Sequence, residues 1–158
     1  MIDKVVGIKE AIRKVKSGDS VMIGGFTQSG CPMNLLRELS KQPVNGLTAI
    51  SEDIGYANTD YYKDTAVGEL LDNKQISKVR VSFIGSNSKA NKLITSGELD
   101  YELIPQGTLA ERIRAGGSGI GGFYTPTGIG TVVEEGKEKK VINGKEYILE
   151  LPLRAEIA

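Results

Sequence analysis

The sequence predicts an open α/β domain with three layers in an αβα arrangement, a mainly parallel sheet and a C-terminal antiparallel hairpin. Short apolar runs alternate with amphipathic segments of about ten residues, which is typical of βαβ units. Glycine is abundant, at 20 of 158 residues, and gathers around two predicted loops. Near the C-terminus an Asn-Gly pair separates two strand-like runs, which is the strongest short signal for a hairpin.

The first helix, strand and second helix follow from the spacing of apolar residues. Residues 8–15 place an apolar stripe on one helical face, and this helix ends at Gly18. Val21 to Ile23 is wholly apolar and predicts a strand covered on both faces. Pro32 suits the first turn of the next helix. The apolar stripe expected for that helix consists of Leu35, Leu36 and Leu39.

The alternation continues to the hairpin. We predict strands at Leu47 to Ser51, Val79 to Ile84 and Leu99 to Ile104, and helices at Asp64 to Leu71, Lys89 to Ser96 and Thr108 to Ala115. Lys139 to Ile142 and Lys145 to Leu151 flank Asn143-Gly144 as hairpin strands. Leu151 to Ala158 has the pattern of a segment entering a further strand. We therefore expect residues 1–158 to form one domain that is truncated at its C-terminal end.

Composition excludes several classes of protein. The 20 basic residues balance the 20 acidic ones, so no net charge favours nucleic acid or an anionic membrane. Histidine is absent, which removes Ser-His-Asp and Cys-His catalysis and imidazole metal sites. With one cysteine, Cys31, an internal disulfide is excluded, and a cytoplasmic location is expected. The first twenty residues resemble neither a signal peptide nor a membrane span.

The first glycine loop follows a strand and precedes a helix, an arrangement that directs backbone N–H groups toward an anion. Gly24 and Gly25 allow positive φ angles and a close approach of backbone to ligand. A tight turn without a ligand is the alternative. The GxGxxG match formed by Gly117, Gly119 and Gly122 follows a helix rather than a strand, which argues against a dinucleotide site.

Polar residues also follow predicted strands. Gln106 begins a helix, where its amide could donate to an oxyanion or merely cap the helix, and Thr108 is expected to be the N-cap. Glu52 and Asp53 could act as nucleophile or base, although solvated loop acids are commoner. Cys31 is expected to be a small buried residue.

Two motifs carry a resemblance to a known family. Gly18-Asp19, three apolar residues and Gly24-Gly25-Phe26, followed by Gly30 and Pro32, resemble the first signature of family I coenzyme A transferases. The second motif, PQGTLAERIRAGGSGIGGFYTPTGIGTVVEEG from Pro105 to Gly136, resembles a long block of their α subunit. The resemblance runs nearly end to end, and the 3-oxoacid, acetate and butyrate-acetoacetate enzymes are the most alike.

This resemblance implies a ping-pong reaction. A glutamate carboxylate attacks an acyl-CoA thioester, forms a mixed anhydride, becomes a glutamyl-CoA thioester and passes CoA to a second acid. In the family that glutamate lies in a Ser-Glu-Asn-Gly motif of the β subunit, which is the expected partner. Ser51-Glu52-Asp53 is only a near match, so this role is not transferred to Glu52.

The resemblance also implies site residues in this chain. Gln106 would help to form the oxyanion hole without being the nucleophile. The loop expected to bind CoA comprises Gly24, Gly25, Phe26, Thr27, Gln28, Ser29 and Gly30. The residues expected to shape the cleft are Gly116, Gly117, Gly119 and Phe123. No metal and no cofactor are expected, since the CoA thioester is a substrate.

The expected function is therefore that of a CoA-transferase α subunit acting on short acyl-CoA donors and small carboxylic acids such as acetate, butyrate or acetoacetate. A non-catalytic domain that binds CoA or another anion is the alternative. A relative of sugar-phosphate isomerases is a third reading, with Glu52 or Asp53 as acid-base residues. The acid pair cannot be identified from one subunit.

Overall fold

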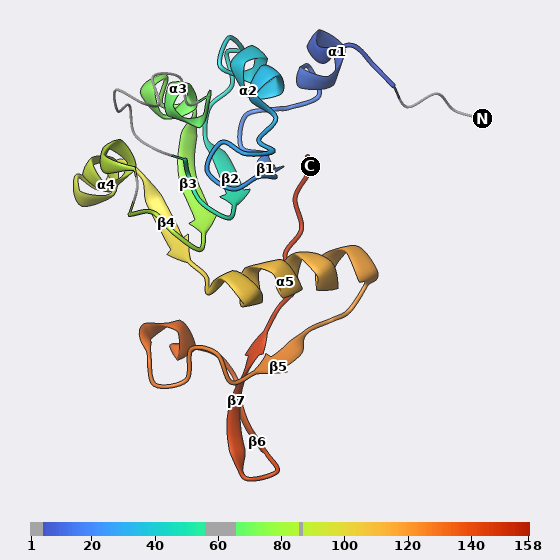
Figure 1. The fold of residues 1–158 in the computed structure, drawn as a ribbon, viewed down its shortest axis with the longest axis vertical. Coiled ribbons are helices and arrows are strands. Elements are labelled where there is room, and N and C mark those ends of the chain that lie inside the picture. Colours follow the sequence, from blue (N-terminus) through green and yellow to red (C-terminus); the bar gives the residue numbers. More distant parts are fainter. Residues whose placement is uncertain (1–4, 56–65, 86) are drawn as a thin grey trace. The chain divides into compact units, whose positions relative to one another are not determined.

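The computed structural model describes residues 5–55, 66–85 and 87–158. Contacts divide the chain into two compact units, one of Met1–Glu102 with Ala155–Ala158 and one of Leu103–Arg154 (Figure 1). Each unit is described by itself. The single domain expected over the whole chain stays a prediction.

The first unit is built on a four-stranded sheet with the order β1-β2-β3-β4. Its strands are β1 (Ser20–Ile23), β2 (Leu47–Ser51), β3 (Ile76–Val81) and β4 (Asp100–Leu103). Its helices are α1 (Ile8–Ile12), α2 (Met33–Leu39), α3 (Ala66–Asp72) and α4 (Ser88–Thr95). Both β1 with β2 and β2 with β3 pair in parallel, which confirms the predicted α/β class and parallel sheet. Residues 64 and 65 of the predicted third helix lie outside the described residues.

The helices of this unit pack on one face of the sheet. Strands in sequential order joined by right-handed crossovers place their connecting helices on the same side. The hydrophobic core accordingly joins alternate strand residues such as Val21, Ala49 and Val79 to Ile12 of α1 and Leu39 of α2. The described part of this unit thus supplies one helical layer of the predicted αβα arrangement. The second layer stays a prediction, because the remaining α-helix of the described residues, α5 (Gln106–Ser118), belongs to the other compact unit.

The other face of the sheet is more polar. Lys78 of β3 pairs with Asp100 of β4 at 2.7 Å, and Arg80 pairs with Glu102 at 2.9 Å. In β1, Val21 and Ile23 are buried, while Ser20 and Met22 are half-buried. Full cover of both faces of this strand stays a prediction, because a run of three apolar residues is too short to distinguish one buried face from two.

The C-terminal residues return to this unit. Ile157 forms a parallel bridge with Val21 at the free edge of β1, and its N–H donates to the Ser20 carbonyl at 3.2 Å. Its carbonyl accepts from the Met22 N–H at 2.8 Å. The expectation of a strand-like C-terminal segment is therefore confirmed at this residue.

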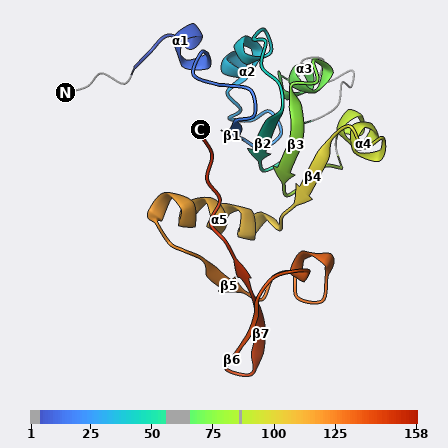
Figure 2. The ribbon, with the colours of Figure 1, turned by 180° about the vertical axis from the view of Figure 1, so that it is seen from behind.

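The second unit contains one long helix and an antiparallel sheet with the order β5-β7-β6 (Figure 2). Its elements are α5 (Gln106–Ser118), β5 (Phe123–Thr125), a 3-10 turn (Val132–Glu134), β6 (Lys139–Ile142) and β7 (Lys145–Glu150). Asn143 and Gly144 have φ angles of 51° and 75°, as a two-residue hairpin turn requires. The predicted hairpin is confirmed, whereas β5 was not predicted because three residues carry too little pattern.

Several predicted boundaries shift. The third strand is Ile76–Val81 rather than Val79 to Ile84, because Leu47 of β2 pairs with Ile76. In α2, Leu36 and Leu39 are buried, but Leu35 is 37% exposed and lies outside the packed stripe. Pro32 precedes α2 at the N-cap position.

The long helix α5 corrects two further predictions. Its first backbone hydrogen bond runs from the Leu109 N–H to the Pro105 carbonyl at 2.9 Å, so Pro105 is the N-cap. Thr108 is therefore a buried residue of the first turn rather than the predicted cap. The helix also continues through Gly116 and Gly117, which the sequence placed in a loop.

Candidate functional site

The carboxyl ends of β1 and β2 carry the first group of predicted site residues. After β1 the loop Gly24–Gly30 folds back on itself: the Phe26 N–H donates to the Ser29 carbonyl at 3.0 Å, and the Ser29 N–H returns a bond of 2.9 Å to Phe26. Thr27 and Gln28 form the tip between these two residues. The Phe26 side chain is 63% exposed, so the loop presents an aromatic ring to the solvent.

The backbone of this loop is tightly constrained. Gly25 has a φ angle of 114°, and a Cβ added there would lie 2.8 Å from the Cys31 nitrogen. Only glycine fits this position, as the sequence suggested. Thr27 has a φ angle of 57°, which is unusual for a β-branched residue and indicates a conformation held by its surroundings.

Asp53 supplies the contact that holds Thr27. Its side chain is 6% exposed and lies just beyond the end of β2. Oδ2 accepts a hydrogen bond of 2.7 Å from the Thr27 N–H, and Oδ1 accepts one of 2.6 Å from the Gly55 N–H. Both oxygens are thus engaged with backbone amides. This arrangement favours a structural role for Asp53 over the nucleophile or base that the sequence left open.

The neighbouring Glu52 has a different environment. Its Oε1 accepts a 2.9 Å hydrogen bond from the Ser82 hydroxyl, while Oε2 is buried and has no hydrogen-bond partner among the described residues. Burial raises the pKa of Glu52, the Ser82 hydroxyl opposes this shift, and the nearby Asp53 carboxyl adds to it. Glu52 is half-buried, with one oxygen bound by Ser82 and the other covered, so neither oxygen is free to attack a substrate.

Cys31 closes the loop at the start of the next helix. Its side chain is half-buried against the hydrophobic core. Burial raises the pKa of the thiol, and the negative charge of Asp53 raises it further. The thiol is therefore protonated near neutral pH. Cys31 was expected to be a small buried residue, and the structure leaves it half-buried.

The second group of predicted residues lies in the other compact unit. Gln106 is the exposed first residue of α5. Gly119 ends this helix with a φ angle of 73°, and Phe123 is the half-buried first residue of β5. Because the Gly24–Gly30 loop belongs to the first unit, its proximity to Gln106 stays a prediction.

The predicted cleft glycines of α5 differ in their surroundings. Gly116 is buried, and a Cβ there would lie 2.2 Å from the Leu153 carbonyl oxygen. Gly117 is exposed, with open space where a Cβ would stand. Gly116 thus allows the helix to pack closely against the C-terminal segment. The role of both glycines in a cleft stays a prediction.

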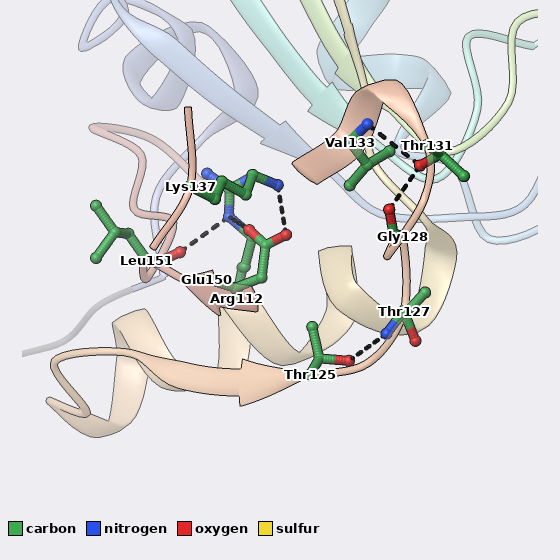
Figure 3. A network of polar contacts seen from close by, with 9 residues as sticks. All are labelled: Arg112, Thr125, Thr127, Gly128, Thr131, Val133, Lys137, Glu150 and Leu151. Atoms are coloured by element: carbon green, nitrogen blue, oxygen red, sulfur yellow. Dashed lines mark hydrogen bonds and ion pairs between the residues drawn. The ribbon is translucent and has the colours of Figure 1, made fainter. Parts of the chain in front are cut away.

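A buried ionic network that the sequence did not reveal joins α5 to β7. Figure 3 shows Glu150 between two cations: its Oε1 lies 2.5 Å from the Lys137 Nζ, and its Oε2 lies 3.9 Å from the Arg112 Nε. The Arg112 Nε also donates to the Leu151 carbonyl at 2.9 Å. Glu150 is 1% exposed, so this network is structural. No short motif marks it, because its three residues come from separate segments.

A run of local hydrogen bonds shapes the segment between β5 and the 3-10 turn (Figure 3). The Thr131 hydroxyl donates to the Gly128 carbonyl at 2.7 Å and accepts from the Val133 N–H at 3.2 Å. The Thr127 N–H donates to the Thr125 hydroxyl at 3.2 Å. These bonds fix a segment that belongs to the second sequence motif.

Membrane-spanning helices and metal-binding clusters are both missing from the described residues 5–55, 66–85 and 87–158. No helix there has both the length and the apolar character needed to cross a membrane. The same ranges contain no group of three metal-ligating Cys, Asp or Glu side chains.

Known proteins similar to this chain agree with the motifs. The family model described as coenzyme A transferase matches residues 5–158. The acetoacetyl-CoA:acetate/butyrate CoA transferase alpha subunit of Clostridium acetobutylicum is 46% identical over 158 residues, which cover 100% of this chain and 70% of the relative. The acetate CoA-transferase subunit alpha of Escherichia coli is 43% identical, with coverage of 100% and 69%.

A solved structure shares the fold. The acyl-CoA transferase apoenzyme of Escherichia coli O157:H7 superposes with a TM-score of 0.78 at 17% sequence identity, over 96% of this chain and 33% of that one. This likeness supports the α/β architecture alone. The match of the family model to nearly the whole chain, the two signature motifs and the identities above 40% show that the chain belongs to the coenzyme A transferase family.

Proposed function

We propose that this chain is the α subunit of a CoA-transferase that moves coenzyme A between a short-chain acyl-CoA and a small carboxylic acid. Membership of the family over residues 5–158 is the observation that carries this proposal. The two relatives described above are named for acetate, butyrate and acetoacetyl-CoA, which suggests acids of this size as substrates. Their designation as alpha subunits suggests a β subunit as the partner.

The chemistry of this chain favours a nucleophile supplied by that partner. No Ser-Glu-Asn-Gly block occurs in the sequence. Glu52 is hydrogen-bonded, has a raised pKa and has one buried oxygen, and both oxygens of Asp53 accept backbone amides. The glutamate of the proposed ping-pong reaction therefore comes from a β subunit with that motif.

The proposed reaction proceeds by acyl transfer. The partner's glutamate oxygen attacks the thioester carbonyl, the C–S bond breaks, and CoA thiolate leaves behind a mixed anhydride. The thiolate then attacks the glutamyl carbonyl and releases the first acid, which leaves a glutamyl-CoA thioester. The second acid repeats these steps in reverse and takes up CoA. Metal ions and other cofactors have no part in this scheme.

Within this scheme the present chain binds and orients the thioester. The exposed Gly24–Gly30 loop offers the backbone of its glycines and the Phe26 ring to CoA. The exposed amide of Gln106 at the start of α5 donates to the developing oxyanion. Gly116, Gly117, Gly119 and Phe123 shape the cleft into which the partner's glutamate enters. A cytoplasmic location accords with the lone free cysteine, Cys31.

Reconstitution tests this function. The chain is co-expressed with a β subunit that carries the Ser-Glu-Asn-Gly motif, and transfer from acetyl-CoA to acetoacetate is measured in the purified complex. We expect turnover by the complex and none by the chain alone. Failure of the complex across a panel of short acyl-CoA donors and acids, with acetyl-CoA still bound, would favour the non-catalytic binding domain instead.

A further inference from the structure

We infer that Asp53 is a positioning residue, whose buried carboxylate fixes the Gly24–Gly30 loop in the conformation that binds the CoA thioester. The inference rests on the proposed function of that loop. It assigns Asp53 neither contact with substrate nor any chemical step.

Two backbone amides from different segments converge on the Asp53 carboxylate. Its Oδ2 accepts from the Thr27 N–H at 2.7 Å, and its Oδ1 accepts from the Gly55 N–H at 2.6 Å. Hydrogen bonds to an ionised acceptor are short and stronger than neutral ones. With the Asp53 side chain 6% exposed, water competes little for either oxygen. The carboxylate therefore ties the tip of one loop to the end of the neighbouring strand.

The backbone of Asp53 is itself held by the neighbouring strand connection. Its backbone forms a parallel bridge with Phe83, next to the end of β3. One residue earlier in both segments, the Ser82 N–H donates to the Glu52 carbonyl at 2.9 Å. These contacts extend the sheet by a residue pair and hold Asp53 in place. Because the Gly24–Gly30 loop is hydrogen-bonded to Asp53, its motion is restricted by the rigid sheet.

The residue that Asp53 holds, Thr27, has an unusual backbone conformation. Thr27 has a φ angle of 57°, which L residues with branched side chains rarely adopt. Gly25 and Gly30 on either side have positive φ angles, which glycine adopts without strain. A strained residue such as Thr27 keeps its conformation when a strong contact from outside the loop specifies it. The hydrogen bond from Thr27 to Asp53 is such a contact.

The test measures loop order and catalysis in the same complex of this chain with its β subunit. In Asp53→Ala we expect hydrogen exchange of the residue 24–30 amides to rise, and the KM for acetyl-CoA to rise by about ten- to a hundredfold, as loss of a hydrogen bond to a charged group implies. The kcat should change much less, because no reacting group is removed. Asp53→Asn keeps one acceptor oxygen and should give intermediate values for both measurements.

A second substitution separates positioning from general stability. Glycine adopts the backbone conformation of Thr27 without a clash of its side chain. Thr27→Gly in the Asp53→Ala background should therefore restore a part of the lost affinity for acetyl-CoA, although it adds no contact. Asp100→Ala is the matched control, since this exposed carboxylate pairs with Lys78 in the same sheet and should leave loop exchange and KM unchanged.

The outcomes are distinct. Unchanged exchange of residues 24–30 in a folded Asp53→Ala or Asp53→Asn protein would overturn the positioning role. A loop that exchanges faster with no change in KM would overturn the link to CoA binding and the proposed role of the loop, while transfer by the complex would still stand. Equal losses in Asp53→Ala and in the Thr27→Gly double variant would show that Asp53 acts only on stability.

Discussion

Gly116 and the carbonyl oxygen of Leu153 lie so close together that a Cβ added at Gly116 would stand 2.2 Å from the oxygen. Gly116→Ala should therefore force the helix and the C-terminal segment apart. We expect the free energy of unfolding to fall by about 1–3 kcal/mol, the range for overpacked sites. Urea denaturation monitored by circular dichroism measures this change.

The adjacent glycine provides the control. A Cβ at Gly117 meets nothing within 4 Å, and the residue lies inside the same helix. Gly117→Ala should stabilise the protein by about 0.5–1 kcal/mol, because alanine loses less backbone entropy in a helix. Similar effects of the two substitutions would contradict the close packing at Gly116.

Because the carboxylate of Glu150 is buried, removal of its cation partner Lys137 should strongly lower the free energy of unfolding. Lys137→Met leaves Glu150, whose side chain is 2% exposed, with the more distant Arg112 alone. We expect a loss of about 3 kcal/mol in the free energy of unfolding, the lower end of the range for broken buried pairs. Arg114→Met breaks an exposed pair with Glu111 and should lie within the measurement error. A loss for Lys137→Met no larger than that control would contradict the network.

Glu52 predicts a dependence of stability on pH. Because burial raises its pKa above the ordinary value of 4.5, the folded protein retains a proton that the unfolded chain releases as the pH rises past that value. The stability contributed by this proton is therefore lost as the pH rises through the folded-state pKa. Glu52→Gln does not titrate, so wild-type stability should fall relative to the variant between acidic and neutral pH.

Denaturation of both proteins at several pH values measures this difference. The control is Glu98→Gln: hydrogen bonds from Lys74 and Ser96 lower the pKa of Glu98, so wild-type stability should rise relative to this variant as the pH increases through the acidic range. A difference between wild type and Glu52→Gln that does not vary with pH would refute the raised pKa.

Gln106 predicts an effect on the chemical step. In the complex with the β subunit, Gln106→Ala should lower kcat by about ten- to a thousandfold, as expected for the loss of an oxyanion donor. The KM for acetyl-CoA should change little. Glu111→Gln, on the same helix, is the control. An unchanged kcat in Gln106→Ala would remove this residue from the oxyanion hole.

Much of the fold follows from short patterns in the chain. The apolar run Leu47–Ser51 is β2 with its predicted bounds, and Asn143-Gly144 forms the turn of the predicted hairpin. These elements depend on local alternation and on backbone preference. The start of β3 was less predictable, because a strand pattern fits both Ile76–Val81 and Val79 to Ile84. Pairing with β2 selects the first of these two ranges.

The candidate site divides in the same way. The glycine loop was recognised from Gly24, Gly25 and Gly30, whose backbone freedom is a property of single residues. The sequence identifies Asp53 only as an acidic residue at the end of a strand. Its hydrogen bond with the Thr27 amide cannot be predicted from local sequence, because the two residues are 26 positions apart. The layers of the predicted αβα arrangement are a related case: the order of the strands places the helices of the first unit on one face of the sheet. The second helical layer stays a prediction, because α5 belongs to the other compact unit.

The amino-acid sequence alone determines the alternation of helices and strands, the two glycine motifs and the family to which the chain belongs. These are features of spacing and of residue type. The folded chain was needed to learn that Asp53 anchors Thr27, that Gly116 contacts Leu153 and that Glu150 joins Lys137 to Arg112. Such contacts join distant segments, and their distances are set by how the segments pack together.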